Sequence, residues 1–244
     1  MGPKMYVMYT KPLGYIIHHH GLNHHFYADD SQLYIKFNPK VNTAATEALT
    51  KIENCLTDIE GWMHMNKLKL NNEKTEVILF TSKHNIRHID LQNMAVNMTG
   101  SEVVPASHVK NLGVTFDSTM CMERHVNTIC RSAYAQLRNI GHIRRYLTND
   151  ATQSLMNGLV TSRLDYCNAL LYGLPKSLIH KLQKVQNTAA RIVTRTSRHS
   201  HITPVLQELH WLPIDLRIKF KVLLHTYKGL HGYAPGYITD ILHI

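Results

Sequence analysis

The hydrophobic pattern of this chain changes near residue 118, and that change constrains what each half can fold into. Before it, short segments rich in aromatic and β-branched residues surround one longer segment with helical spacing, which indicates mixed helix and strand. After it, apolar residues recur every three or four positions, which predicts helices alone. The sequence therefore predicts an α+β fold with two domains, residues 1–118 and residues 119–244.

The charge divides at the same place. Residues 1–118 hold 11 Lys and Arg against 11 Asp and Glu, so their net charge is zero. Residues 119–244 hold the remaining 16 of the 27 basic residues and 6 of the 17 acidic ones, which gives the whole excess of +10. A basic domain of this kind favours polyanions such as nucleic acid, although solubility alone also explains a positive charge.

In the first domain, the segment His25–Phe37 predicts two strands joined by a tight polar turn at Ala28-Asp29-Asp30-Ser31. Helical spacing predicts a helix over residues 43–68. Further strands are predicted at residues 77–80, 95–98, 103–104 and 109–116, the last with Gly113 inside it.

In the second domain, helices are predicted at residues 122–146, 150–171, 175–196 and 213–231. Asn149 or Asp150 is the predicted cap of the second helix, and Pro175 is the predicted first residue of the third. Trp62 and Trp211 are predicted to be core anchors.

Several protein classes are excluded. No run of about 18 apolar residues is present, so no membrane span is expected. The four cysteines lack C-x-x-C spacing, which indicates reduced intracellular thiols rather than a disulfide framework. His18-His19-His20 and His24-His25 lie in a predicted linker without the spacing of a catalytic zinc site, so no zinc is expected.

Asp29 and Asp30 are adjacent carboxylates at the tip of an apolar hairpin. Their mutual repulsion makes this arrangement costly, and magnesium offers one reason to keep it, because Mg²⁺ prefers carboxylate oxygens, water and phosphates. The alternative is an ordinary turn in which Asp accepts backbone hydrogen bonds. The two residues alone leave both interpretations open.

The flanking sequence resembles reverse transcriptases of non-LTR, jockey-like retrotransposons. Tyr27-Ala28-Asp29-Asp30 is similar to their Y-x-D-D hairpin. The other similar segments, in chain order, are Gly61-Trp62; Asn66-Lys67-Leu68-Lys69-Leu70-Asn71; Glu73-Lys74-Thr75-Glu76; Val109-Lys110-Asn111-Leu112-Gly113-Val114; Arg163-Leu164-Asp165-Tyr166-Cys167-Asn168; Leu182-Gln183-Lys184-Val185-Gln186-Asn187; and His210-Trp211-Leu212-Pro213. The resemblance implies a partial polymerase palm in residues 1–118 and an all-α thumb in residues 119–244.

The same resemblance implies roles for the hairpin and its surroundings. Asp29 would bind catalytic Mg²⁺ beside Asp30, and Tyr27 and Ala28 would lie near the primer end. Lys74 would lie near the phosphates of the incoming nucleotide, although it also fits a solvated loop residue. Leu112-Gly113 would grip the primer backbone. The implied activity is RNA-directed DNA synthesis, with an RNA template, a DNA primer, deoxynucleotides and magnesium.

The resemblance also implies that part of the polymerase is missing. Reverse transcriptases take another metal-binding aspartate, and the whole fingers subdomain, from the region upstream of this hairpin. Here 28 residues precede Asp29, and none of them is acidic. We therefore expect the isolated chain to be inactive or nearly so, and to need the upstream polymerase half in cis or in trans.

Basic residues of the third predicted helix point to a second function. A basic arc, separate from the apolar stripe of that helix, is predicted to contain Lys181, Lys184, Arg191, Arg195 and Arg198. Such a ridge could contact successive phosphates without reading base sequence. The alternative is the solvated face of an amphipathic helix. Arg144-Arg145 is a weaker candidate of the same kind. A non-enzymatic nucleic-acid-binding protein is therefore the alternative function.

Overall fold

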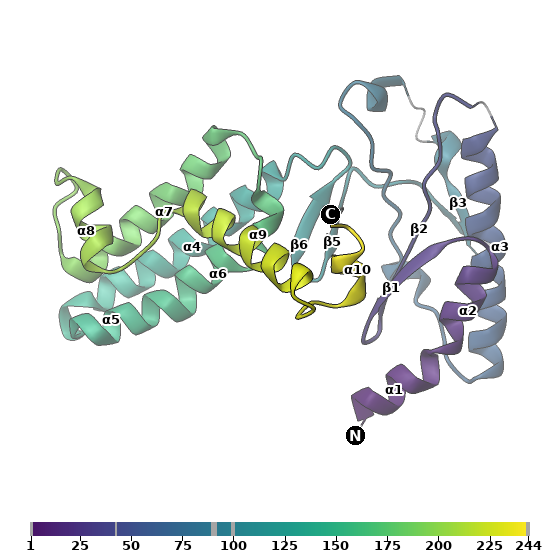
Figure 1. Ribbon diagram of the computed structural model, residues 1–244, viewed down its shortest axis with the longest axis horizontal. Coiled ribbons are helices and arrows are strands. Elements are labelled where there is room, and N and C mark those ends of the chain that lie inside the picture. The colour runs from purple at the N-terminus through teal and green to yellow at the C-terminus, as the bar shows by residue number, and fades with distance from the viewer. Residues whose placement is uncertain (1, 42, 89–91, 99–100, 243–244) are drawn as a thin grey trace. The chain divides into compact units, whose positions relative to one another are not determined.

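A computed structural model describes residues 2–41, 43–88, 92–98 and 101–242, and its helices and small antiparallel sheets make an α+β fold (Figure 1). The chain forms two compact units, residues 1–109 and residues 110–244. This division comes earlier in the chain than the change in charge and period near residue 118. Each unit has a hydrophobic core of its own.

The described part of unit 1 contains helices and two separate pairs of antiparallel strands. In chain order it contains α1 (Gly2–Thr10), α2 (Pro12–His19), β1 (Asn23–Tyr27), β2 (Asp30–Tyr34), α3 (Ala44–Met65), the 3-10 turns η1 (Asn72–Lys74), η2 (Asn85–His88) and η3 (Gln92–Met94), β3 (Val96–Met98) and β4 (Ser101–Val103). Strands β1 and β2 pair antiparallel, as do β3 and β4. The predicted strand–turn–strand at 25–37 and the predicted helix at 43–68 are therefore confirmed.

The core of unit 1 lies between α2, α3 and the first hairpin. Ile17 from α2 and Cys55 from α3 are fully buried in it, and Phe26 and Leu33 from the hairpin pack against it. Gly14 permits close approach of β1 to α2, because a Cβ there would lie 3.0 Å from the Nε2 atom of His24. The hairpin is therefore held through one face, and its other face is left to solvent.

Two strand predictions are wrong. Residues 77–80 form no strand in the described structure; Val77 accepts a single backbone hydrogen bond of 2.8 Å, from Ala106, and no ladder follows. The predicted continuous strand at 109–116 is a hairpin, β5 (His108–Asn111) and β6 (Val114–Asp117), with Leu112 and Gly113 as its loop. Both loop residues have positive φ, +45° and +83°, which reverses the chain where a single strand was expected.

Unit 2 is helical after this hairpin. It contains α4 (Glu123–Ile143), η4 (Arg144–Tyr146), α5 (Asn149–Met156), the π-helical segment η5 (Asn157–Thr161), α6 (Ser162–Asp165), η6 (Asn168–Leu171), α7 (Lys176–Thr194), α8 (Ile202–Glu208), α9 (Ile214–Leu230) and α10 (Gly236–Thr239). The predicted helices at 122–146, 175–196 and 213–231 are confirmed within a few residues. Helix α8 was not predicted.

The predicted helix at 150–171 is interrupted. It changes to a π-helical segment at Asn157 and ends at Asp165, after which Cys167 adopts a left-handed φ of +51°. Its cap is Thr148, whose Oγ1 accepts a 3.2 Å hydrogen bond from the Ala151 amide, rather than Asn149 or Asp150. Pro175 precedes α7 as its cap residue instead of forming its first turn.

Asp117 fixes the start of α4. Its carboxylate accepts hydrogen bonds from the backbone amides of Cys121 (3.0 Å) and Met122 (2.7 Å) and from the hydroxyl of Thr119 (2.9 Å). Burial alone would raise the pKa of Asp117, but these hydrogen bonds to the charged form outweigh it and lower the pKa to about 2. The hairpin that carries Leu112 and Gly113 is thereby attached to the first helix of unit 2.

All four cysteines are free thiols. In the part of the chain that the structure describes, no helix is both long and apolar enough to span a bilayer.

Candidate functional site

The tip of the β1–β2 hairpin is a two-residue loop formed by Ala28 and Asp29. Tyr27 pairs directly with Asp30 across the two strands. Ala28 has a φ of +55°, a left-handed conformation that non-glycine residues rarely adopt because the Cβ crowds the backbone. The loop therefore stores local strain directly beside the two carboxylates.

The carboxylates of Asp29 and Asp30 face solvent. Both residues are exposed, and neither side chain makes a hydrogen bond or ion pair with any residue that the structure describes. The hairpin turn thus does not use them as backbone acceptors, and solvated turn carboxylates fit this geometry as well as cation ligands do. Tyr27 is 61% exposed and shares the outer face of the hairpin with Asp30.

These two carboxylates do not make up a metal site by themselves. Among the described residues, no group of three or more His, Cys, Asp or Glu side chains is placed to hold a metal ion. A shallow cavity of about 280 Å³ at the tip is lined by Gly2, Tyr6, Ala28 and Asp29, which adds no further carboxylate. Because a two-ion centre needs carboxylates that bridge and flank both ions, this set does not fit such a centre by itself.

Lys74 ends the 3-10 turn η1 and is exposed. Its side chain makes no hydrogen bond or ion pair with a described residue. Its geometry agrees equally with the solvated-loop interpretation and with a role toward nucleotide phosphates.

The loop at Leu112-Gly113 is held by a residue from a different segment of unit 2. The hydroxyl of Tyr166 donates a 2.7 Å hydrogen bond to the carbonyl oxygen of Leu112. A Cβ on Gly113 would lie 3.4 Å from Cε1 of Tyr166, so glycine also allows the ring to approach. Leu112, like Ala28, is a non-glycine residue at positive φ. Both predicted sites, one at the tip of the β1–β2 hairpin and one at the tip of the β5–β6 hairpin, therefore carry strained backbone.

The predicted basic ridge is only partly present. Lys181, Lys184 and Arg191 lie on α7, but the helix ends at Thr194 and Arg195 adopts a left-handed φ of +57°. Arg198 lies beyond the helix, so the five residues do not form one helical arc.

Protein groups also engage part of that ridge. Lys181 donates to Asn127 at 2.9 Å and pairs with Glu123 at 3.5 Å, and Arg191 donates to the carbonyl of Ser200 at 3.2 Å. Lys184 is exposed and makes no such contact with a described residue.

Arg144 is a structural residue rather than a phosphate ligand. It is only 7% exposed, and its guanidinium donates to the carbonyls of Ile192 (2.8 Å), Val193 (2.7 Å) and Leu147 (2.8 Å) and to the side chain of Asn149. A cation at this position satisfies terminal carbonyls of α7 and complements its dipole. The prediction that Arg144 contacts phosphates of a nucleic acid is therefore wrong, whereas Arg145 stays a candidate.

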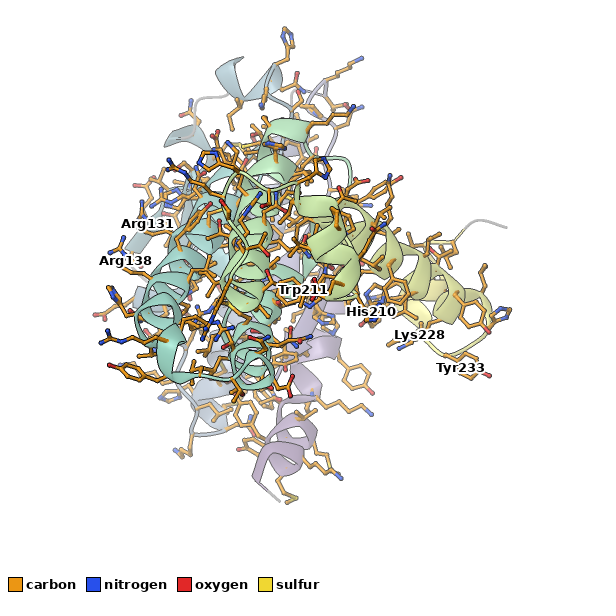
Figure 2. All side chains as sticks on the ribbon, turned by 90° about the vertical axis from the view of Figure 1, so that its left-hand side faces the viewer. Arg131, Arg138, His210, Trp211, Lys228 and Tyr233 are labelled. Atoms are coloured by element: carbon orange, nitrogen blue, oxygen red, sulfur yellow. The ribbon has the colours of Figure 1, made fainter. Side chains whose placement is uncertain are left out.

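A different row of arginines was missed. Arg124, Arg131, Arg138 and Arg145 recur every seven residues along α4 and η4, and all four are exposed. Seven residues return to nearly the same side of a helix about 10.5 Å further along its axis. Figure 2 shows Arg131 and Arg138 projecting from the same side of α4. These two make no hydrogen bond or ion pair with described residues.

Arg145, the last arginine of the row, lies over the ring of Tyr146, with its guanidinium carbon 4.6 Å from the ring centroid. The period of seven was visible in the sequence. The third predicted helix was chosen instead, because its basic residues are more closely spaced.

In the second half of the chain, polar residues of the segments that resemble the retrotransposon polymerases join elements of unit 2. Gln183 Oε1 accepts a 2.8 Å hydrogen bond from the amide of Ile214, and Gln186 donates a 2.8 Å hydrogen bond to the carbonyl of Leu212. Both contacts hold the start of α9 against α7. Asp165 forms an ion pair with Arg217. These motif residues therefore stabilise the helical unit and do not line an open site.

The histidines do not lie in a linker, contrary to prediction. His18 and His19 end α2, and His24 and His25 belong to β1. Burial, followed by the charges of His18 and His25, lowers the pKa of His24. Trp211 is buried in the core of unit 2, and Trp62 packs against the core of unit 1, as predicted.

Comparison with known proteins supplies the link to a family. No protein-family model and no solved structure matches the chain. Over 202 residues it is 25% identical to the probable RNA-directed DNA polymerase from transposon BS of Drosophila melanogaster, which covers 79% of this chain. The similarity supports a reverse-transcriptase-like origin. The chain spans 20% of the length of that relative.

Proposed function

We propose that this chain is the C-terminal palm and thumb portion of a non-LTR, jockey-like reverse transcriptase. In this proposal residues 1–118 belong to the palm and residues 119–244 form the thumb. Asp29 and Asp30 contribute carboxylates to a magnesium centre that the upstream polymerase half completes. No chemical step is assigned to the isolated chain, because its described carboxylates do not fit a two-ion centre.

The observation that carries this proposal is the hairpin tip. A strained two-residue loop presents two adjacent carboxylates to solvent, and neither is used by the surrounding protein. Because both carboxylates are exposed and have no partner among the described residues, they are available to an incoming cation. The similarity to a transposon polymerase supports the same interpretation.

Primer extension tests the polymerase proposal. Wild-type chain and Asp29→Asn are incubated with a primed RNA template, deoxynucleotides and Mg²⁺. We expect no extension by either protein above the background without protein. Extension by the wild type that Asp29→Asn abolishes would show a complete centre and overturn the expected inactivity. Equal extension by both would remove Asp29 from the mechanism and overturn the assignment of the tip.

Metal binding at the tip gives a readout that does not need activity. Mn²⁺ added in small steps should selectively broaden the backbone NMR signals of Asp29 and Asp30 in the wild type. Asp29→Asn should lose most of this broadening, whereas Asp58→Asn, on α3, should retain it. Uniform weak broadening over all exposed acidic residues would contradict a metal-binding role for the hairpin.

The second candidate function is nucleic-acid binding without catalysis, and the α4 row of Arg124, Arg131, Arg138 and Arg145 favours it. If these arginines contact phosphates, binding should be independent of sequence and should weaken steeply with salt. Lys184 of α7, which is exposed and has no partner among the described residues, is a further candidate for nucleic-acid contact. The proposed contact lies within unit 2.

Fluorescence anisotropy with a primer–template duplex tests this function. If Arg131 and Arg138 each contact a phosphate, Arg131→Gln/Arg138→Gln should lower the slope of log affinity against log salt by about 2. Lys36→Gln/Lys40→Gln removes the same charge from unit 1 and should leave the slope unchanged. An equal effect of both double variants would mean that only net charge matters.

A further inference from the structure

An open groove of about 500 Å³ lies between α2 and α3, which pack against each other in unit 1 (Figure 1). A volume of this size is typical of sites that hold small ligands. The groove is lined by Tyr15 and Ile16 from α2 and by Asp58, Gly61, Trp62 and Met65 from α3. It therefore combines aromatic and apolar walls with a single carboxylate, and it shares no residue with the cavity at the hairpin tip.

The aromatic side chain of Trp62 is held in place from outside the groove. Trp62 packs against the core of unit 1, and the ring of Tyr9 on α1 lies 6.1 Å from it, centroid to centroid. The Tyr9 hydroxyl donates a 2.8 Å hydrogen bond to the carbonyl oxygen of Asn66, just after α3. Because Tyr9 is fixed at the end of α3, Trp62 is braced on that side. Tryptophan is the aromatic residue that attracts cations most strongly.

Gly61 leaves open space in the groove beside Trp62. A Cβ on Gly61 would have no atom within 4 Å, so packing within the described protein does not require glycine here. Glycine inside a helix destabilises it relative to alanine, and Gly61 lies inside the 22-residue helix α3. The space above Gly61 is therefore available to an occupant of the groove.

Asp58 supplies the charge in the groove. Its Oδ2 lies 2.7 Å from Nε2 of His20, whereas its Oδ1 has no hydrogen-bond partner among the described residues. His20 thus orients the carboxylate, which is 58% exposed, and leaves one oxygen available. Helix α3 as a whole holds four acidic residues against Lys51: Glu47, Glu53, Asp58 and Glu60. The local field therefore favours a cation.

We propose that this groove binds a methylated ammonium group, placed against Trp62 and Tyr15 and close to Oδ1 of Asp58. Aromatic faces attract quaternary ammonium groups, whereas the ammonium of unmodified lysine is strongly hydrated. A neutral apolar occupant would cover the carboxylate without compensating its charge, which is unfavourable. The group can come from a choline-like molecule or from a trimethylated lysine of another protein. This site does not depend on the proposed polymerase or nucleic-acid function.

NMR of the full chain tests the proposal, because the protein has only two tryptophans, Trp62 and Trp211. Choline is added at pH 8.0, where histidine side chains are largely uncharged. The indole N–H signal of Trp62 should shift until the site is saturated, and the signal of Trp211, which is buried in unit 2, should stay in place. The uncharged analogue 3,3-dimethyl-1-butanol has the shape of choline and should bind at least tenfold more weakly.

Two peptides of the same sequence distinguish the sources of the cation. One carries trimethyl-lysine and the other unmodified lysine, and the unmodified peptide should bind at least tenfold more weakly. Tighter binding of the trimethylated peptide than of choline would identify a protein partner, and tighter binding of choline would identify a small molecule. Both results support the site.

Variants of the groove separate specific binding from misfolding. Asp58→Asn and Tyr15→Leu should each raise the Kd for choline at least fivefold, whereas Asp150→Asn and Tyr34→Leu, at exposed positions elsewhere, should leave it unchanged. Gly61→Ala should raise the thermal unfolding midpoint, because alanine favours the helix. It should nevertheless raise the Kd, because its methyl group occupies the groove. Weaker binding by a more stable variant cannot result from misfolding.

Three outcomes would overturn the proposal. Equal affinity for choline and 3,3-dimethyl-1-butanol would remove the selection for charge. Unchanged choline affinity in Asp58→Asn and Tyr15→Leu would place binding outside the groove. A Trp62 signal that responds neither to choline nor to the trimethylated peptide would show that the groove binds no methylated ammonium group.

Discussion

Tyr166 and Leu112 are joined by a 2.7 Å hydrogen bond from the phenolic hydroxyl to the backbone carbonyl. The bond connects the segment after α6 to the tip of the β5–β6 hairpin, two segments that the sequence resemblance assigns to separate motifs. Leu112 has positive φ, so its loop needs external support. Tyr166 supplies that support, and this explains why an exposed tyrosine stands directly after Asp165.

Replacing Tyr166 with Phe should destabilise the β5–β6 hairpin. The substitution removes one hydrogen bond to an exposed carbonyl, which costs about 0.5–1 kcal/mol. Amide exchange of Gly113 and Val114, measured by NMR, should become faster. Tyr134→Phe is the control, because the hydroxyl of Tyr134 makes no hydrogen bond to a described residue. Unchanged exchange in both variants would show that the loop does not depend on Tyr166.

Arg144 and Arg145 should differ sharply in their effect on stability. Arg144→Met leaves several buried carbonyls without a donor and should lower the free energy of unfolding by about 2–4 kcal/mol. Arg145→Met alters an exposed side chain and should change it by less than about 0.5 kcal/mol. Chemical denaturation of the two variants measures the difference. Similar values would contradict the structural role of Arg144.

Ala28→Gly should stabilise the first hairpin. Ala28 has a φ of +55°, which glycine adopts without the Cβ clash, so we expect a gain of about 0.5–1 kcal/mol. Ala135→Gly, at an exposed position inside α4, should instead cost about 1 kcal/mol. Thermal unfolding monitored by circular dichroism compares the two. Destabilisation by Ala28→Gly would show that the tip does not hold a left-handed residue.

Stability should fall as pH drops below about 6.5, and His125 should contribute to this fall. Burial lowers the pKa of His125, and its Nδ1 accepts a 3.3 Å hydrogen bond from the amide of Thr115. The unfolded state, with the ordinary pKa near 6.5, therefore binds more protons than the folded state between the folded pKa and 6.5. The contribution of neutral His125 is fully present above that range and is lost as pH falls through it.

His125→Gln tests this dependence through denaturation at pH 7.5 and pH 5.5. The wild type should lose more stability between these values than the variant does. His142→Gln, at an exposed position of α4, should retain the wild-type difference. An identical loss in wild type and His125→Gln would assign the pH dependence to other groups.

The sequence predicted those features that short segments determine. The β1–β2 hairpin followed from apolar residues on both sides of a polar turn, and α7 from its apolar stripe after Pro175. The break at residues 166–168 was missed because Cys167 is a non-glycine residue at positive φ, which has no local signal. The prediction of a strand at residues 77–80 was wrong because a strand needs a hydrogen-bonded neighbour, and the composition of a segment does not show whether one is present.

The candidate site was predictable to the same extent. Asp29 and Asp30 were recognised as adjacent acids at a hairpin tip, but their lack of protein partners could only come from the structure. Arg144 and Arg145 look identical in sequence, and only the position of the α7 carboxyl end makes one of them a core residue. Contacts between distant segments decide such cases, and local pattern does not encode them.

The hydrogen bonds of Gln183 and Gln186 affect how unit 2 would respond to proteolytic cleavage. Residues 197–201 form an exposed connection after α7, whereas these two side chains fasten the beginning of α9 back onto that helix. A protease that nicks the connection should therefore yield two fragments that remain together in native gel filtration and separate only in denaturant. The core contacts and hydrogen bonds between these helices, rather than the connecting peptide, thus hold the bundle together.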